Sequence, residues 1–256
     1  MRRSKAYLEE RENQILQMIN GSQTVGVEEI AQRFEISPST VRKQLNAMHK
    51  KGLITRTYGG AEAGWSSAEG GNIVHLKEKT RIAQMARTYI HNGDIIAIGA
   101  GTTTTLLATM LLNAADMTVV TNSLYVATET MKNPQIETRI CGGIVRLRNG
   151  AIVGPQTGDF FKNMLVDKAF ISPDSVTLGF GIADLNAFVS FSQRAIISCA
   201  KQVFILADHS KIGLDTYTDR IAAFEDVDYL ITNREVNQRQ LEELGRESSK
   251  MEVILA

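Results

Sequence analysis

Apolar positions near the start of the chain recur at helical spacing and predict three short helices followed by a wing. An opening helix is expected over 8–20, with a buried face made of Ile15, Leu16 and Ile19. The face of the second helix consists of Val27, Ile30, Ala31 and Phe34. The face of the third consists of Val41, Leu45 and Met48. Residues 53–61 then read as a strand and a turn, which completes the pattern.

The break between the second and third helices has the features of a tight turn. Ser37 can cap the free N–H groups of the third helix, and Pro38 sits where a missing N–H costs nothing. Ile36 and Val41 stand at the positions of a hydrophobic staple. Helix, turn, helix and wing together predict a DNA-binding module, although two amphipathic helices of a bundle would give a similar pattern.

Charge favours the DNA-binding interpretation over the bundle. Residues 1–60 hold ten Lys and Arg against six Glu, a net charge of +4, whereas the remainder carries −4 and the whole chain is neutral. The exposed face of the third helix contains no carboxylate between 37 and 52. Side chains there can donate to phosphates and to base edges. We expect DNA contacts from the helix and the wing at Ser37, Ser39, Thr40, Arg42, Lys43, Gln44, Lys50, Arg56 and Tyr58.

The length of 256 residues suits a small head and a larger body. We expect a head at 1–61, a linker rich in Gly, Ala and Ser at 62–76, and a body at 77–256. The sequence lacks both a long apolar run and an apolar signal core, so a cytoplasmic protein outside the membrane is expected. Cys141 and Cys199 are expected to be buried free thiols, and no Cys/His cluster has the spacing of a metal site.

In the body, short apolar strands alternate with helical stripes, which predicts an α/β domain with a largely parallel sheet. Strands are expected at 94–98, 117–121, 136–141, 167–172, 202–207, 229–232 and 251–255. Helices are expected around 82–90, 103–112, 124–131, 190–200 and 238–244.

The segment 98–105, Ile-Gly-Ala-Gly followed by four threonines, runs from a strand through a loop into a helix. Glycines allow a ligand to approach the backbone, and the N–H groups at the start of a helix suit an anion such as phosphate. A tight turn capped by threonines would look the same. A dinucleotide site is disfavoured, because Thr104 occupies the place of the third glycine in that motif.

Three more loops follow strand ends, at 121–123, 141–143 and 207–211. Ligands of open α/β sheets bind beyond the carboxyl ends of the strands. Asp208 can bind hydroxyls and Lys211 a phosphate, but each alone could equally be a turn residue or a solvated lysine. Together with the threonine loop they suggest a phosphorylated polyol. The expected effector-binding residues are Gly101, Thr102, Thr103, Thr104, Asn122, Ser123, Gly143, Asp208 and Lys211.

With these motifs in this order, the chain resembles the DeoR-type bacterial repressors of sugar catabolism. The resemblance is carried by 27–31, 37–45, 52–61, 77–79, 101–103, 121–123, 142–143, 167–170, 181–182 and 208–211. It implies a winged helix–turn–helix head on an α/β body similar to ribose-5-phosphate isomerase and glucosamine-6-phosphate deaminase. It also implies a sugar-phosphate effector and a homo-oligomer, a dimer or a tetramer, that bridges operators.

Several positions depart from the family pattern. Lys43-Gln44 replaces the usual Arg-Asp of the recognition helix, and Tyr58 replaces a histidine of the wing, which implies an operator of its own. Gly99 and Val189 stand where the family usually has acids, which implies an altered effector.

We therefore predict a DNA-binding repressor of a carbohydrate-utilisation operon, released by a phosphorylated sugar, with no cofactor and no catalytic residues. The alternative is a sugar-phosphate isomerase or deaminase with a DNA-binding head. The acids missing at Gly99 and Val189 weigh against that enzyme, because its chemistry needs a positioned base.

Overall fold

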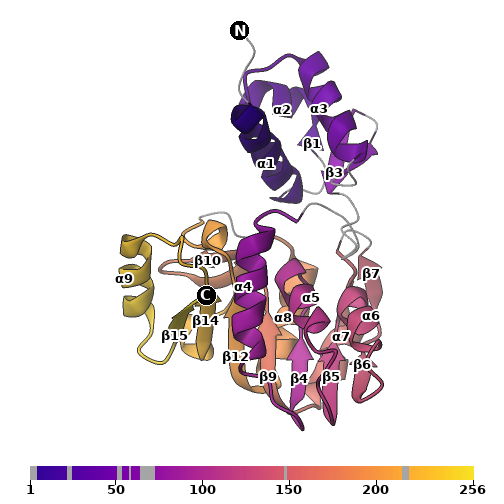
Figure 1. The fold of residues 1–256 in the computed structure, drawn as a ribbon, viewed down its shortest axis with the longest axis vertical. Helices are drawn as coiled ribbons and strands as arrows, with labels where there is room; N and C mark the ends of the chain where they lie inside the picture. Colours follow the sequence, from indigo (N-terminus) through magenta and orange to yellow (C-terminus); the bar gives the residue numbers. More distant parts are fainter. Residues whose placement is uncertain are drawn as a thin grey trace. The chain divides into compact units, whose positions relative to one another are not determined.

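The computed structural model describes residues 5–21, 25–50, 54–57, 59–63, 73–146, 149–214 and 219–256. The chain divides into two compact units, Met1–Val74 and His75–Ala256. Figure 1 labels their helices and strands. Each unit has a hydrophobic core of its own.

The first unit is the expected three-helix head with a wing. Its elements are α1 (Lys5–Gly21), β1 (Val25–Gly26), α2 (Val27–Arg33), α3 (Pro38–Lys50), β2 (Ile54–Thr57) and β3 (Gly60–Ala63). The wing is an antiparallel hairpin of β2 and β3, and the short strand β1, which we did not expect, adds to β3 as a third strand. The strand β3 includes two residues that we had expected in the linker.

The core of the head is formed by the apolar positions that the spacing singled out. Ile15, Ile19, Ile30, Val41 and Leu45 are fully buried in one cluster. Burying side chains of this size stabilises the unit by about 1.5–3 kcal/mol each. The helix spacing therefore placed the correct faces inward.

The second unit is built on a seven-stranded sheet whose neighbouring strands all pair in parallel. Its strands, in chain order, are β4 (Ile95–Ile98), β5 (Met117–Thr121), β6 (Ile136–Ile140), β9 (Val166–Ile171), β12 (Ala200–Leu206), β14 (Tyr229–Thr232) and β15 (Glu252–Leu255). All seven were expected from the sequence.

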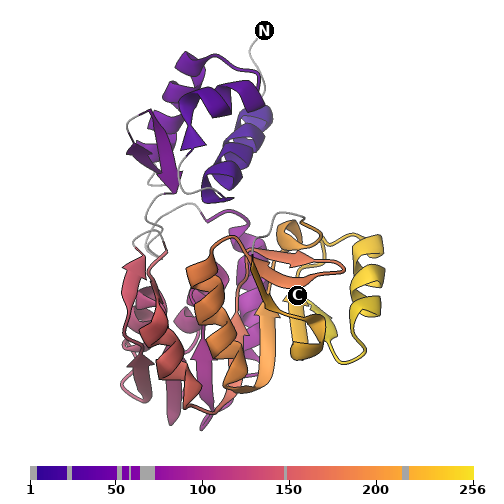
Figure 2. The ribbon, with the colours of Figure 1, turned by 180° about the vertical axis from the view of Figure 1, so that it is seen from behind.

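Helices cover both faces of this sheet (Figures 1 and 2). On one face, α4 (Leu76–Arg87), α5 (Thr102–Thr109) and α6 (Leu124–Thr130) pack over one hydrophobic cluster. On the other, α7 (Pro155–Lys162), α8 (Ala187–Ser198) and α9 (Gln238–Glu247) pack over a second cluster. The sheet is apolar on both faces because both are buried, as is usual for parallel sheets.

Smaller elements lie outside the seven-stranded sheet, in the segments that follow the carboxyl ends of its strands. A two-stranded hairpin joins β7 (Ile144–Arg146) and β8 (Ala151–Val153), and a three-stranded antiparallel sheet joins β10 (Ser175–Thr177), β11 (Gly181–Asp184) and β13 (Asp219–Ala222). Two 3-10 turns, η1 (His209–Lys211) and η2 (Phe224–Asp226), follow β12 and β13. These five strands and α7 were not predicted from the sequence.

The order of the strands in the sheet is β15-β14-β12-β9-β4-β5-β6. From β4 the chain proceeds outward in one direction through β5 and β6, and from β9 it proceeds in the other. The carboxyl ends of β4 and β9 therefore form a topological switch point, which is where ligands bind in open α/β sheets.

Candidate functional site

The third helix of the head presents the polar face that the sequence predicted. Ser37 stands before α3, where its hydroxyl accepts from the backbone N–H of Thr40 at 3.2 Å and lies 2.8 Å from the Thr40 hydroxyl. Ser37 thus caps the helix while remaining exposed. Ile36 is half-buried against the core that contains Val41, as expected for a staple.

Beyond the cap, Ser39, Arg42 and Lys43 are exposed, whereas Gln44 is half-buried. Arg42 lies 3.5 Å from the carboxylate of Glu28 on α2, so a carboxylate from a neighbouring helix does reach this face. Both side chains are more than half exposed, and such surface pairs contribute at most about 1 kcal/mol. A phosphate can therefore compete with Glu28 for Arg42.

Three of the residues expected to bind DNA have side chains outside the described part of the structure. Tyr58 lies outside the described residues, as does most of the expected linker. The side chains of Lys50 and Arg56 also lie outside them, although their backbones belong to α3 and β2.

In the second unit, the threonine loop lies at the switch point. Gly101 precedes α5, and the first helical hydrogen bond runs from Thr105 N–H to the Gly101 carbonyl at 2.9 Å. The N–H groups of the first turn thus have no partner within the helix. A Cβ on Gly101 would lie 2.9 Å from the Cβ of Ser172, which follows β9, so glycine permits this close approach of the two loops.

The threonine hydroxyls of this loop have different roles. Those of Thr104 and Thr105 donate to the Gly101 carbonyl at 2.9 and 2.8 Å, and so serve the turn itself. Thr102 is half-buried at the first helical position. The hydroxyl of Thr103 is fully buried and has no hydrogen-bond partner among the described residues. Because buried hydroxyls are normally paired, Thr103 is the threonine whose bonding capacity remains for a ligand.

Lys211 and Asp208 reach the same region from the loop after β12. The Lys211 ammonium donates to the Ser172 hydroxyl at 3.2 Å and to the Pro173 carbonyl at 2.5 Å. Asp208 uses Oδ1 to accept from the N–H and the hydroxyl of Ser210, at 3.1 and 2.5 Å. Its Oδ2 is buried without a hydrogen-bond partner among the described residues. Asp208 is thus both a turn residue and an available acceptor.

Lys79 on α4 is a member of this cluster that our sequence analysis did not select. Its ammonium lies 3.9 Å from Asp208 Oδ2, too far for a hydrogen bond, and its side chain is only 12% exposed. Burial, and to a lesser extent the charge of Lys211, lowers the pKa of Lys79 from 10.5 to about 8, although Asp208 opposes the shift. The only sequence feature that pointed to Lys79 was its place in the segment 77–79, which is one of the segments that carry the family resemblance.

The charges around Asp208 also set its protonation. Burial pushes the pKa of Asp208 upward, but the positive charges of Lys211 and Lys79 and the hydroxyl of Ser210 outweigh burial and hold the pKa below its ordinary value. The carboxylate is therefore ionised at neutral pH and can accept from a hydroxyl group of a ligand.

A second buried acid, Asp184 at the end of β11, was also missed. Burial first, and then the nearby Asp174, raises the pKa of Asp184 to about 8, while Lys211 and Arg194 act in the opposite direction. Its Oδ1 accepts from the backbone N–H of Asp174 at 2.8 Å. Nothing in the sequence pattern marks this residue, because β11 itself was not recognised.

Three of the expected effector-binding residues have structural contacts. The side-chain amide of Asn122 accepts from Ala100 N–H at 3.0 Å and donates to the Ile152 carbonyl at 3.2 Å. Ser123 caps α6 by accepting from the N–H of Val126. A Cβ on Gly143 would lie 2.6 Å from the Val153 carbonyl oxygen. These residues hold the loops that surround the cluster.

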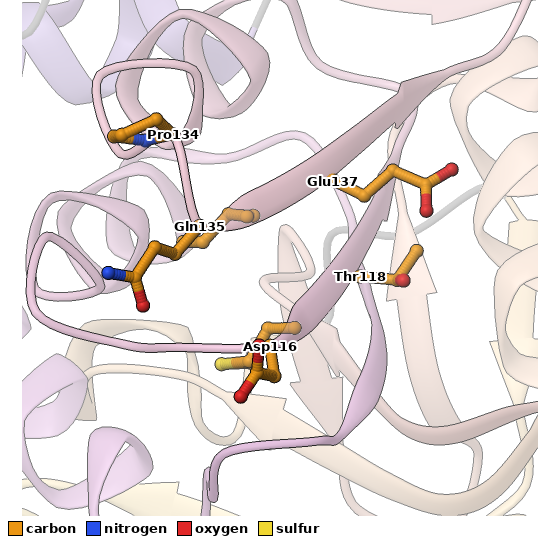
Figure 3. A pocket seen from close by; sticks show the side chains of 7 residues that line it. Asp116, Thr118, Pro134, Gln135 and Glu137 are labelled. Atoms are coloured by element: carbon orange, nitrogen blue, oxygen red, sulfur yellow. The ribbon is translucent and has the colours of Figure 1, made fainter.

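A shallow hollow elsewhere in the second unit has a volume of about 510 Å³ (Figure 3). It is lined by Asp116, Met117, Thr118, Pro134, Gln135, Ile136 and Glu137, at the amino ends of β5 and β6. The threonine loop lies at the opposite ends of the strands. This hollow is therefore separate from the cluster of Thr103, Lys79, Asp208 and Lys211.

Comparison with known proteins assigns both units. Residues 74–234 match the model of the DeoR C terminal sensor domain, and residues 11–66 match that of the DeoR-like helix-turn-helix domain. The chain belongs to the DeoR family. It is therefore a DNA-binding transcriptional regulator with a sensor domain, which confirms the class predicted from the sequence.

Individual relatives agree with this assignment of the DeoR-family chain. The HTH-type transcriptional regulator GolR of Listeria innocua is 30% identical over 234 residues, covering 90% of this chain and 92% of the relative. The glycerol-3-phosphate regulon repressor of Escherichia coli is 31% identical over 208 residues, covering 80% and 82%. Among solved structures, ribose 5-phosphate isomerase A from Methanocaldococcus jannaschii is 18% identical over 52% of each chain, with a TM-score of 0.38.

The two positions at which the family resemblance led us to expect acids, Gly99 and Val189, are both tightly packed in this DeoR-family chain. A Cβ on Gly99 would lie 2.9 Å from Cδ1 of Ile171, so a larger residue requires that side chain to move. Val189 on α8 is buried in a small apolar cluster with Ala100, Ala151 and Val153. These two positions thus have apolar neighbours, and Asp208 and Asp184 are buried acids of the same unit.

Two further findings concern membrane-spanning helices and the two cysteines, within the part of the chain that the structure describes. No helix there is both long and apolar enough to cross a membrane. Within the same residues, Cys141 and Cys199 are buried free thiols, and burial raises the pKa of both.

Proposed function

We propose that this DeoR-family regulator represses a carbohydrate-related operon in the cytoplasm and is released from its operator by a phosphorylated sugar or polyol. The observation that carries the proposal is the buried hydroxyl of Thr103 on the first turn of α5, at the switch point of the sheet, which has no hydrogen-bond partner among the described residues. Lys211 donates to Ser172, whose Cβ would lie 2.9 Å from a Cβ on Gly101 just before α5, and Asp208, from the same loop as Lys211, faces Lys79.

The chemistry of this cluster fits a ligand with an anionic end and a hydroxylated end. The free N–H groups of α5 and the Thr103 hydroxyl suit phosphate oxygens, and the helix N-terminus favours negative charge. The ammonium groups of Lys79 and Lys211 add positive charge. Asp208 Oδ2 supplies an acceptor for a ligand hydroxyl. The name of the glycerol-3-phosphate regulon repressor makes a small phosphorylated polyol a natural first probe.

In the head, we propose that α3 enters the major groove of the operator. Ser39, Arg42, Lys43 and Gln44 would face base edges, while Arg42, Lys50 and Arg56 would also bind phosphates and supply the salt dependence of binding. The amide of Gln44 suits adenine, but its Oε1 is buried in the free head, so this contact requires the side chain to turn outward on binding. A homo-oligomer would bring two such heads to one operator.

The proposal is tested by fluorescence anisotropy of an operator selected from random DNA with the purified full chain. Glycerol 3-phosphate, glucose 6-phosphate and other sugar phosphates are added to the complex, and thermal shift of the free protein reports their binding. Thr103→Ala combined with Lys211→Ala should bind operator normally but should not be released. Release of this double variant at wild-type concentrations of sugar phosphate would refute the site.

Enzyme activity is tested with the same protein. We expect no conversion of aldose phosphates above background. Turnover that is lost in Asp208→Ala would refute a purely regulatory function.

A further inference from the structure

The first half of α4 is tied to the loops after β12 and β14 by three side-chain contacts. These contacts are His75–His209, with ring centroids 4.9 Å apart at 73°; Lys79–Asp208, at 3.9 Å; and Arg81–Glu235, at 2.6 Å. We call these six residues the α4 clasp. One of its three pairs, Lys79–Asp208, belongs to the proposed effector site, so the clasp connects that site to the start of α4.

The two loops in the clasp are also bonded to each other through Asn233. Its Oδ1 accepts from the backbone N–H of His209 at 2.7 Å, and its Nδ2 lies 2.9 Å from the His209 ring nitrogen Nδ1. The same amide donates to Glu235 at 2.6 Å. These contacts form a connected network. Asp208 is adjacent in sequence to His209, His209 is hydrogen-bonded to Asn233, and Asn233 is hydrogen-bonded to Glu235.

The residue at the start of the clasp has an unusual backbone. His75 is left-handed, with φ of 56° and ψ of 40°, immediately before α4. For a residue with a Cβ this conformation is unfavourable and persists only where the surroundings hold it. The surroundings here are the His209 ring and the hydrogen bond from Lys79 N–H to the His75 carbonyl at 2.9 Å.

The position of His75 in the chain gives this conformation its significance. His75 is the first residue of the second unit, and the preceding residue, Val74, packs against the hydrophobic core of the head. A change in the backbone of His75 is transmitted covalently to a residue of the DNA-binding unit.

We propose that the α4 clasp transmits effector binding to the head, an inference that rests on the proposed function of the sensor site. Lys79 and Asp208 face each other at a distance longer than a hydrogen bond, and Oδ2 of Asp208 has no donor among the described residues. Ligand oxygens and hydroxyls that bind these groups separate the pair. This separation loosens the first turn of α4, and His75 then leaves its left-handed conformation. The contacts of the clasp are lost, and with them the conformation of the protein that binds the operator.

Breaking the clasp elsewhere should therefore imitate the effector. In His209→Ala and in Glu235→Gln, operator affinity without any sugar phosphate should fall at least about fivefold, the lower end of typical allosteric coupling. Glu235 is well exposed, so its substitution leaves the core intact. The matched control is His91→Ala, which removes a histidine that is 72% exposed and outside the clasp, and which should bind operator as the wild type does.

The measurement is operator anisotropy of the full-length variants at one salt concentration, with a thermal melt to confirm that each is folded. Wild-type operator affinity in both His209→Ala and Glu235→Gln would overturn the clasp. A wild-type chain that no sugar phosphate releases would instead refute the proposed function, while the ligand-free affinities would still decide whether the clasp controls the head.

Discussion

The buried ammonium of Lys79 should make the stability of the protein rise with pH above neutrality. Its side chain is 12% exposed, and burial lowers its pKa from 10.5 to about 8. At about 1.36 kcal/mol per pKa unit, this shift corresponds to roughly 3 kcal/mol of unfolding free energy. The charged form is thus costly in the folded protein, despite the attraction of Asp208.

The direction of the effect follows from the protons bound in each state. Between about pH 8 and pH 10.5 the unfolded chain keeps the Lys79 proton, whereas the folded chain releases it, so the free energy of unfolding rises with pH through this window. Below about pH 8 both states are protonated and the full penalty applies. Other groups titrate as well, so the contribution of Lys79 is read as a difference from a variant.

Lys79→Met removes the titrating group while keeping an unbranched side chain. We expect the variant to be more stable than the wild type near pH 7 by up to roughly 3 kcal/mol, with the advantage disappearing as the pH approaches about 10.5. Urea unfolding followed by circular dichroism at several pH values measures it. Lys77→Met, on the exposed side of the same helix, is the control and should show a constant difference. A pH-independent difference for Lys79→Met would refute the reasoning.

Three further predictions follow from single contacts. Thr103→Val should leave the unfolding free energy unchanged or raise it by about 1 kcal/mol, because the hydroxyl has no partner among the described residues, yet it should abolish the thermal shift caused by sugar phosphates. Gly143→Ala should lower the free energy of unfolding by roughly 2 kcal/mol or more, measured by urea unfolding, because its Cβ would lie 2.6 Å from a carbonyl oxygen and because Gly143 has a φ of 148°. Gly142→Ala is the control and should have no such effect, because the space around Gly142 is open. Arg42→Ala should weaken operator binding and reduce its salt slope by about one charge. Arg33→Ala, which removes an exposed arginine of α2, is the control, and equal slopes in all three proteins would exclude Arg42 from the interface.

The central strands of the parallel sheet were predictable because they contain short apolar runs that are buried, as in β4, β5 and β12, whereas the edge strands β6 and β15 are partly exposed. Such runs carry their own signal, independent of their neighbours. The hairpin β7–β8 and the strands β10, β11 and β13 carry no such signal. They are only three or four residues long, and the pairing of β11 depends on a partner distant in the chain, as in Ile182 of β11 opposite Ala222 of β13.

The candidate site was predicted in part for the same reason. Loops that follow recognisable strands could be located, so Thr103, Asp208 and Lys211 could be selected from the sequence as candidates, and their role in binding an effector stays a prediction. Lys79 and Asp184 were not selected, because they come from a helix face and from an unrecognised strand. Their unusual pKa values arise only from burial beside other charges, which local sequence does not encode.

The sequence by itself determined the class of this protein: a basic helix–turn–helix head, a parallel α/β body and a glycine–threonine loop at the end of a strand. These features depend on spacing along the chain, because helices, strands and caps are local structures. Tertiary structure decided which residues are available for chemistry. The side chains of Asn122 and Ser123 hydrogen-bond within the loops, whereas the Thr103 hydroxyl and Oδ2 of Asp208 have no hydrogen-bond partner among the described residues. The α4 clasp joins α4 to the loop that carries Asp208. Such distinctions require the three-dimensional neighbours of each side chain, since burial and pairing are set by residues far away in the sequence.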